Sequence, residues 1–139
     1  MTETVPANFH PREIELAREL QLQGVGPEPK VGDWFIADDR HHVIMRVEQR
    51  SGKTFLADEE DNSFALDAVV RLLHRVDCRE WLMERDWDLD AQNTTDGGVK
   101  AVIRRRNTDF HVERTEPTEL AAIYSAMLEI DNLIHFGWA

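Results

Sequence analysis

The sequence predicts an α+β fold, and three local patterns between residues 77 and 130 carry that prediction. Asp77-Cys78-Arg79-Glu80 matches a capping box, in which a polar residue opens a helix and a glutamate follows three positions later. Residues 93–98 read Asn-Thr-Thr-Asp-Gly-Gly, which is typical of a turn between two strands. Glu116-Pro117 indicates a second helix with proline at its first position. Together these patterns predict a helix, an antiparallel sheet of three strands and a helix.

Residues 1–29 are expected to form an arm and one helix. Apolar side chains recur at helical spacing from Pro11 to about Gln23, and Gly24 is a typical helix end. The Gly- and Pro-rich residues 24–29 then predict a linker or a sharp turn.

Residues 30–75 are expected to form a small β-rich subdomain. Short apolar segments between polar turns predict strands at residues 32–37, 42–48 and 54–57. In the second of these, one face carries Val43, Met45 and Val47, and the other face carries His42 and Ile44. Short strands with tight turns predict a small curled antiparallel sheet, for which an SH3-like half-barrel is one possible form.

Residues 76–139 are expected to form the helix–three-strand–helix subdomain, packed with the rest as one compact domain. The predicted elements are a helix at 78–85, strands at 87–92, 99–105 and 110–113, and a helix from Pro117 toward Phe136. Spacing predicts that these elements bury Trp81, Leu82, Trp87, Leu89, Ala91, Val99, Ala101, Ile103, Phe110, Val112, Leu120, Ile123, Tyr124, Met127 and Ile130.

Composition limits the classes of function. The 139 residues are 42% apolar and include 27 acidic against 16 basic side chains, a formal net charge of −11. Such a charge repels nucleic acids and anionic membranes and suits a basic partner. Cys78 is the only cysteine, so no intrachain disulfide can form. Without a signal-peptide pattern or an apolar run of membrane-spanning length, the expected location is the cytoplasm.

Five residues are the candidate metal ligands in the sequence: Asp38, Asp39, His41, His74 and His111. They are the candidate ligands for a metal-dependent or acid–base enzyme, provided that the fold brings them together. The favoured interpretation is that they are solvated loop and strand side chains, so we expect no metal and no other cofactor.

A second acidic segment, residues 58–62, is similar to a calcium-binding loop only in its charge. Position six of such a loop would be Ser63 instead of glycine, and position twelve would be Val69 instead of glutamate. The segment is therefore predicted to be a solvated turn.

The basic run Arg104-Arg105-Arg106 is predicted to be neutralised by neighbouring strands. Strand alternation puts Lys100, Arg104 and Arg106 on the outer face. The preceding strand contributes Asp88 and Asp90 to that face, and the following strand contributes Asp109, His111 and Glu113. Opposite charges on adjacent strands stabilise a sheet, so we do not expect this run to bind nucleic acid.

The C-terminal tail is unusually apolar. Phe136 and Trp138 are its large aromatic residues, and we expect them to pack on the chain itself or on another subunit or protein. They are the candidate interaction residues.

The order of segments in this chain resembles that of short bacterial and prophage-encoded proteins. The segments in question are Lys30-Val31-Gly32-Asp33-Trp34-Phe35, the strands after it, Leu66 to Leu73, and Glu80-Trp81-Leu82. In those proteins a small β-rich unit precedes a helix–strand–strand–helix unit. Residues 77–130 are also similar in layout to the ABA-sandwich domains of phage proteins. The resemblance implies the fold and a mobile-element origin, and it supplies no catalytic residue.

From the sequence we expect a non-catalytic accessory or protein-interaction protein, with no catalytic residues assigned. The alternatives are the metal-dependent or acid–base enzyme and a protein that mimics the charge of nucleic acid or inhibits a nucleic-acid-binding protein.

Overall fold

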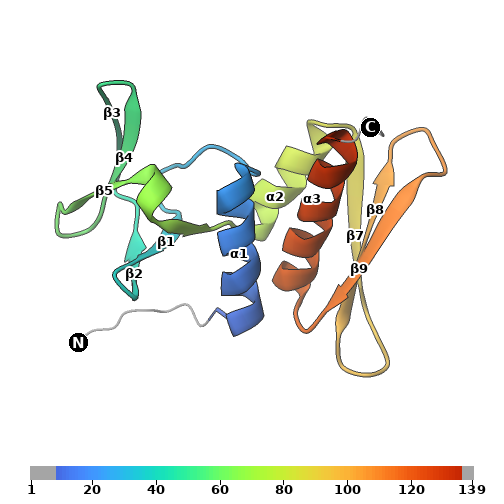
Figure 1. Cartoon of the computed structure of the whole chain (residues 1–139). Helices are drawn as coiled ribbons and strands as arrows, with labels where there is room; N and C mark the ends of the chain where they lie inside the picture. The colour runs from blue at the N-terminus through green and yellow to red at the C-terminus, as the bar shows by residue number, and fades with distance from the viewer. Residues whose placement is uncertain (1–8, 136–139) are drawn as a thin grey trace.

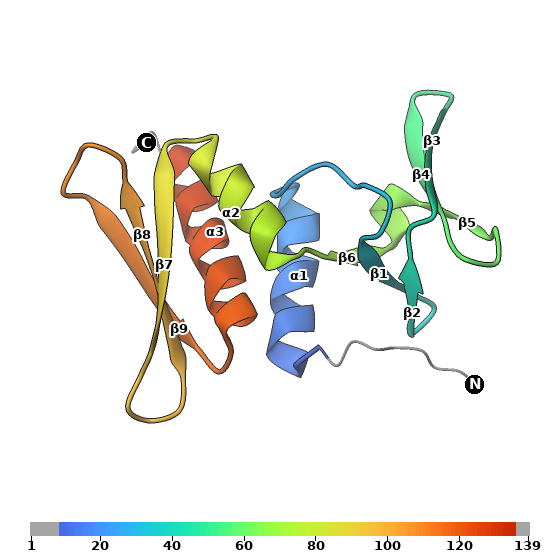
Figure 2. The ribbon, with the colours of Figure 1, turned by 180° about the vertical axis from the view of Figure 1, so that it is seen from behind.

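The computed structural model describes residues 9–135, which contain three α-helices and three small antiparallel sheets. Figures 1 and 2 show α1 between a β-rich unit on one side and a helix–sheet–helix unit on the other. The predicted α+β class is confirmed. No helix among the described residues is both long enough and apolar enough to cross a membrane.

Helix α1 spans Pro11–Gln23, as predicted. Its cap uses His10, whose Nδ1 accepts a hydrogen bond from the Arg12 backbone, while the Glu13 carboxylate accepts one from the His10 backbone. Gly24 ends the helix in the left-handed conformation at φ 68°. The other carboxylate oxygen of Glu13 accepts a 2.5 Å hydrogen bond from Thr118, which fixes α1 beside the start of α3.

The β-rich unit contains two three-stranded sheets, so the single sheet that was predicted is divided. One sheet has the order β2 (Arg40–Val43), β1 (Trp34–Ala37), β6 (Val70–Leu72). The other has the order β3 (Arg46–Arg50), β4 (Lys53–Ala57), β5 (Ser63–Ala65). A short 3-10 helix, η1 (Leu66–Ala68), leads from β5 to β6.

The predicted strand at residues 42–48 is interrupted where it passes from one sheet to the other. The backbone N–H of Ile44 donates to Asp33 beside β1, and the next N–H, of Met45, donates to Ala57 on β4. The buried face of this segment is that of His42 and Ile44, whereas Met45 is exposed. The small core of the unit packs around Phe35, Ile44 and Leu56.

The helix–sheet–helix unit contains α2 (Arg75–Met83), β7 (Trp87–Asn93), β8 (Val99–Arg105), β9 (His111–Glu116) and α3 (Glu119–His135). The sheet order is β7-β8-β9, and the predicted turn at residues 93–98 joins the first two strands. Each residue predicted to be buried in this unit is buried or half-buried except Phe110, which is exposed and meets the Trp87 ring edge to face.

Both predicted helix starts in this unit are wrong. Helix α2 begins three residues before the predicted position, so Asp77 lies inside its first turn and pairs with Lys30 instead of capping the helix. Helix α3 begins after Pro117, because Glu116 continues β9 and the Thr118 hydroxyl accepts the Ala121 backbone N–H.

The main core joins these parts. It contains Leu16 and Leu20 of α1, Leu72 of β6, and residues of α2, the β7–β9 sheet and α3. Apolar burial of this kind is the dominant force in folding. The predicted segments 1–29, 30–75 and 76–139 therefore share buried surface through α1 and β6.

Candidate functional site

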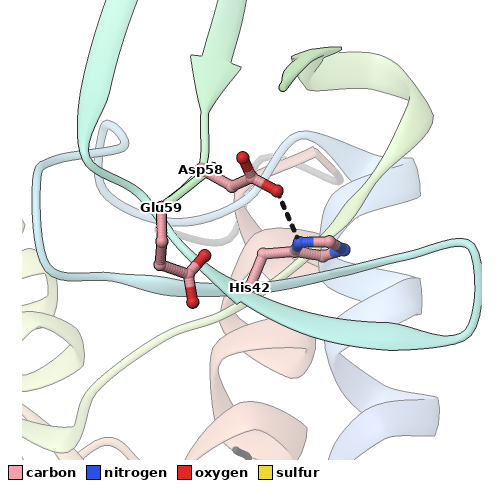
Figure 3. Close-up of side chains that lie close together, drawn as sticks. All are labelled: His42, Asp58 and Glu59. Carbon is pink, nitrogen blue, oxygen red and sulfur yellow. Dashed lines mark hydrogen bonds and ion pairs between the residues drawn. The ribbon is translucent and has the colours of Figure 1, made fainter. Parts of the chain in front are cut away.

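The group of side chains best equipped for chemistry lies in the β-rich unit, where His42 of β2 meets Asp58 just after β4 (Figure 3). His42 Nδ1 lies 2.9 Å from Asp58 Oδ2, and His42 Nε2 lies 3.2 Å from the Ala37 carbonyl oxygen. Both nitrogens thus face acceptors. A hydrogen bond to the Ala37 carbonyl requires a hydrogen on Nε2, and a hydrogen bond to the Asp58 carboxylate requires one on Nδ1, so the tautomer of the ring decides which contact is a hydrogen bond.

Asp58 is fixed by its own loop. Its Oδ1 accepts hydrogen bonds from the backbone N–H groups of Glu60, at 3.0 Å, and Asn62, at 2.8 Å. Burial by itself raises the pKa of the Asp58 carboxyl, but these two N–H groups and the His42 ring outweigh it, so the pKa lies below its ordinary value. Asp58 is therefore a carboxylate at neutral pH.

Glu59 completes the group from the solvent side. Its Oε1 accepts the Val43 backbone N–H at 3.3 Å, and its side chain is exposed. Ligand atoms of His42, Asp58 and Glu59 all lie within 4.8 Å of one another, a spacing at which they could hold one metal ion. Among residues 9–135 this is the one group of three or more such side chains that meets this spacing.

Aromatic rings enclose His42. The Phe35 ring stacks on it at a centroid distance of 5.0 Å and an angle of 18°, and the Phe64 ring lies 5.0 Å away on a tilt. Only 5% of His42 and 3% of Asp58 is exposed. The low polarity of such surroundings strengthens the hydrogen bond between the two groups and makes an unpaired polar group costly there.

The candidate metal ligands from the sequence lie apart from this group. Asp38 and Asp39 are exposed in the β1–β2 turn with positive φ, and His41 stacks on Phe9. His74 precedes α2, with its Nε2 3.7 Å from Asp33 Oδ1. His111 lies on β9, with its Nε2 3.1 Å from Glu113 Oε2. The structure does not gather the five into one cluster.

The sequence offered a weak signal for the true group. His42 has the same strand parity as the apolar Ile44, which is unusual for a solvated histidine, and Asp58 follows directly on a buried strand end. The two residues are 16 positions apart, and only the pairing of β3 with β4 brings them together.

A second set of charges lies where the β-rich unit meets the helices. Three side-chain atoms here are buried: Nε and Nη1 of Arg71, on β6, and Oδ1 of Asp33. None of them has a hydrogen-bond partner among residues 9–135. Burial lowers the pKa of Arg71 and raises that of Asp33. Arg71 also borders a pocket of about 180 Å³ together with residues 24–29, which include the acidic Glu28.

The other residues discussed from the sequence are Cys78, the charged residues of the outer sheet face, and two aromatic residues of the tail. Cys78 is completely buried, and burial raises the pKa of its thiol. The predicted outer face of the sheet carries opposite charges: Arg106 pairs with Asp88 at 3.1 Å, and Lys100 Nζ lies 3.7 Å from Glu113. Arg104 lies opposite Asp88 and His111 in the strand register. Phe136 and Trp138 lie outside the described residues.

No family model, curated protein or solved structure matches this chain.

Proposed function

We propose that this chain is a non-catalytic accessory protein that binds a basic protein partner through the acidic end of its β-rich unit. The acidic end consists of the exposed residues Asp38, Asp39, Glu59, Glu60 and Asp61. The observation that carries the proposal is the double contact of the His42 ring.

His42 holds the two acidic loops beside each other. Its Nε2 binds the carbonyl of Ala37, the residue before Asp38, and its Nδ1 binds Asp58, the residue before Glu59. A buried ring thus fixes the bases of both loops, which gives a rigid surface of five carboxylates. Arg46 pairs with Asp61 at 2.8 Å, so it neutralises part of that charge. A net charge of −11 adds to the attraction for a basic surface.

The buried position of His42 and Asp58 favours a binding role over a catalytic one. A general base must reach the substrate proton within about 3 Å. The His42 ring, however, is enclosed by Phe35 and Phe64, and both of its nitrogens face groups of the chain itself.

Affinity capture with charge-matched variants tests the proposal. The triple variant Asp38→Asn, Asp39→Asn, Glu60→Gln removes three charges from the acidic end. Asn tolerates the positive φ of 54° and 61° at the first two positions. The control, Glu84→Gln, Asp90→Asn, Asp109→Asn, removes three exposed charges elsewhere. We expect the wild type and the control to capture the same basic protein in a salt-sensitive manner, and the loop variant to lose it.

Equal capture by all three proteins would contradict the proposal, as would turnover in a broad substrate screen. The identity of the captured protein separates the two forms of binding. A nucleic-acid-binding protein that DNA or RNA displaces from this chain would favour charge mimicry at the same surface.

A further inference from the structure

We propose that His42, Asp58 and Glu59 form a binding site for one divalent transition-metal cation of the Zn²⁺ class. The inference does not depend on partner binding, although Glu59 belongs both to this group and to the acidic end. One imidazole nitrogen and two carboxylates are donors that suit zinc, and water commonly completes a set of three protein ligands. Their ligand atoms lie within 4.8 Å of one another.

The strongest support is that each ligand side chain has a hydrogen-bond contact outside the group. His42 Nε2 lies 3.2 Å from the Ala37 carbonyl oxygen, to which it can donate. Asp58 Oδ1 accepts the Glu60 and Asn62 N–H groups, which leaves Oδ2 directed at His42. Glu59 Oε1 accepts the Val43 N–H. Outer hydrogen bonds of this kind orient the ligands of protein metal sites and fix the histidine tautomer.

A cation at this position would bind the lone pair of His42 Nδ1. With Nε2 donating to the Ala37 carbonyl, Nδ1 directs either a lone pair or a hydrogen at Asp58. A lone pair bonds to the metal directly, and a hydrogen on Nδ1 leaves to solvent as a proton before the nitrogen bonds to the metal. The 2.9 Å contact between Nδ1 and Oδ2 must then lengthen slightly, because each ligand atom lies about 2.0–2.2 Å from zinc.

A cation can reach the site from solvent, and its binding would stabilise the fold. Glu59 is exposed, whereas His42 and Asp58 are buried, so a cation reaches the group from the Glu59 side. Once bound, it would join β2 to the loop after β4. A ligand that binds only the folded state stabilises it by an amount that grows with the logarithm of the ligand concentration relative to the dissociation constant, so the melting temperature rises.

Titration of the full-length chain with Zn²⁺, and with Co²⁺ as a spectroscopic probe, tests the site. We expect one ion per chain, a higher melting temperature, and Co²⁺ absorption typical of nitrogen and oxygen ligands. Glu59→Gln should weaken binding about tenfold or more. Glu59 is exposed, so this variant is expected to fold.

Glu60→Gln is the matched control, because Glu60 is the adjacent exposed acid and its side chain lies outside the group. It should bind Zn²⁺ as the wild type does. No saturable binding by the wild type, or equal affinity in the Glu59 and Glu60 variants, would overturn the proposal. So would binding that perturbs the NMR signals of another histidine and leaves those of His42 unchanged. Failure of the wild type to capture a basic partner, with its metal binding intact, would contradict only the proposed function.

Discussion

The hydroxyl of Tyr124, on α3, donates a 2.6 Å hydrogen bond to the backbone carbonyl of Leu73, which follows β6. The Tyr124 side chain is completely buried, and burial raises the pKa of its hydroxyl, so it stays a donor at neutral pH. This bond ties the last helix to the segment that leaves the β-rich unit. It satisfies a buried carbonyl at the point where the two units meet.

Tyr124→Phe should lower the free energy of unfolding by about 1–3 kcal/mol, because the Leu73 carbonyl loses its donor while remaining buried. Urea denaturation followed by tryptophan fluorescence measures the change. Thr95→Val, which removes an exposed hydroxyl in the β7–β8 turn, should change stability by less than about 0.5 kcal/mol. Equal effects of the two substitutions would show that the Tyr124 bond is not stabilising.

Gly26 lies close to the side chain of Leu73. Its φ is +125°, and a Cβ placed there would lie 2.9 Å from Leu73 Cδ1. Leu73 is buried in the main core and has little room to move. Gly26→Ala should therefore destabilise the chain by about 1 kcal/mol more than Gly24→Ala, whose Cβ meets nothing within 4 Å at a φ of +68°. Thermal unfolding of the two variants compares them directly.

Local sequence patterns were sufficient where an element depends on its own residues. Strand β8 spans Val99–Arg105 as predicted, because its alternation and the Asp-Gly-Gly turn before it are both local signals. The helix from Pro11 to Gln23 was likewise predicted from its own spacing and its glycine end. The charge pattern on the outer sheet face also followed from strand parity alone.

Tertiary contacts decided the features that the sequence did not reveal. The pattern starting at Asp77 fits a capping box, yet its carboxylate pairs with Lys30, which is 47 residues away in the chain. The same holds for the candidate site. His42 lies at the start of a predicted strand and Asp58 in a segment predicted to be a solvated turn, and the switch of the chain between two sheets at Ile44 and Met45, with the pairing of β3 and β4, joins them. Sequence periodicity carries no information about such a switch.

The ion pair of Arg12 and Glu116 should contribute a pH-dependent part of stability. The two side chains form a bidentate contact, at 2.7 and 3.0 Å. The Arg12 hydrogen bonds lower the pKa of Glu116 below 4.5 in the folded state. As the pH falls, the unfolded chain takes up this proton first, so the contribution is complete above about pH 4.5 and is lost as the pH falls through the lower folded pKa.

Glu116→Gln should therefore lower the free energy of unfolding by about 0.5–1 kcal/mol at pH 7, and by less near pH 3. The expected effect at pH 7 is small because the Arg12 side chain is 37% exposed. Urea denaturation at a series of pH values measures both. Glu19→Gln, at an exposed position of α1, should leave the pH profile unchanged. If the free energy of unfolding of the Glu116 variant changes with pH in parallel with that of the wild type, the Arg12–Glu116 pair does not make a pH-dependent contribution to stability.

Cys78 should report on unfolding, because its thiol has no exposed surface and burial raises its pKa above the ordinary value. Disulfide exchange requires both a thiolate and access, and the folded chain supplies neither. A thiol reagent such as DTNB should therefore label no cysteine in the native protein and one per chain in denaturant. In the native state the labelling rate should follow the opening of the core around α2. Tyr124→Phe should accelerate the labelling of Cys78, because both residues belong to the main core. Rapid labelling of the native wild type would contradict the buried position of Cys78.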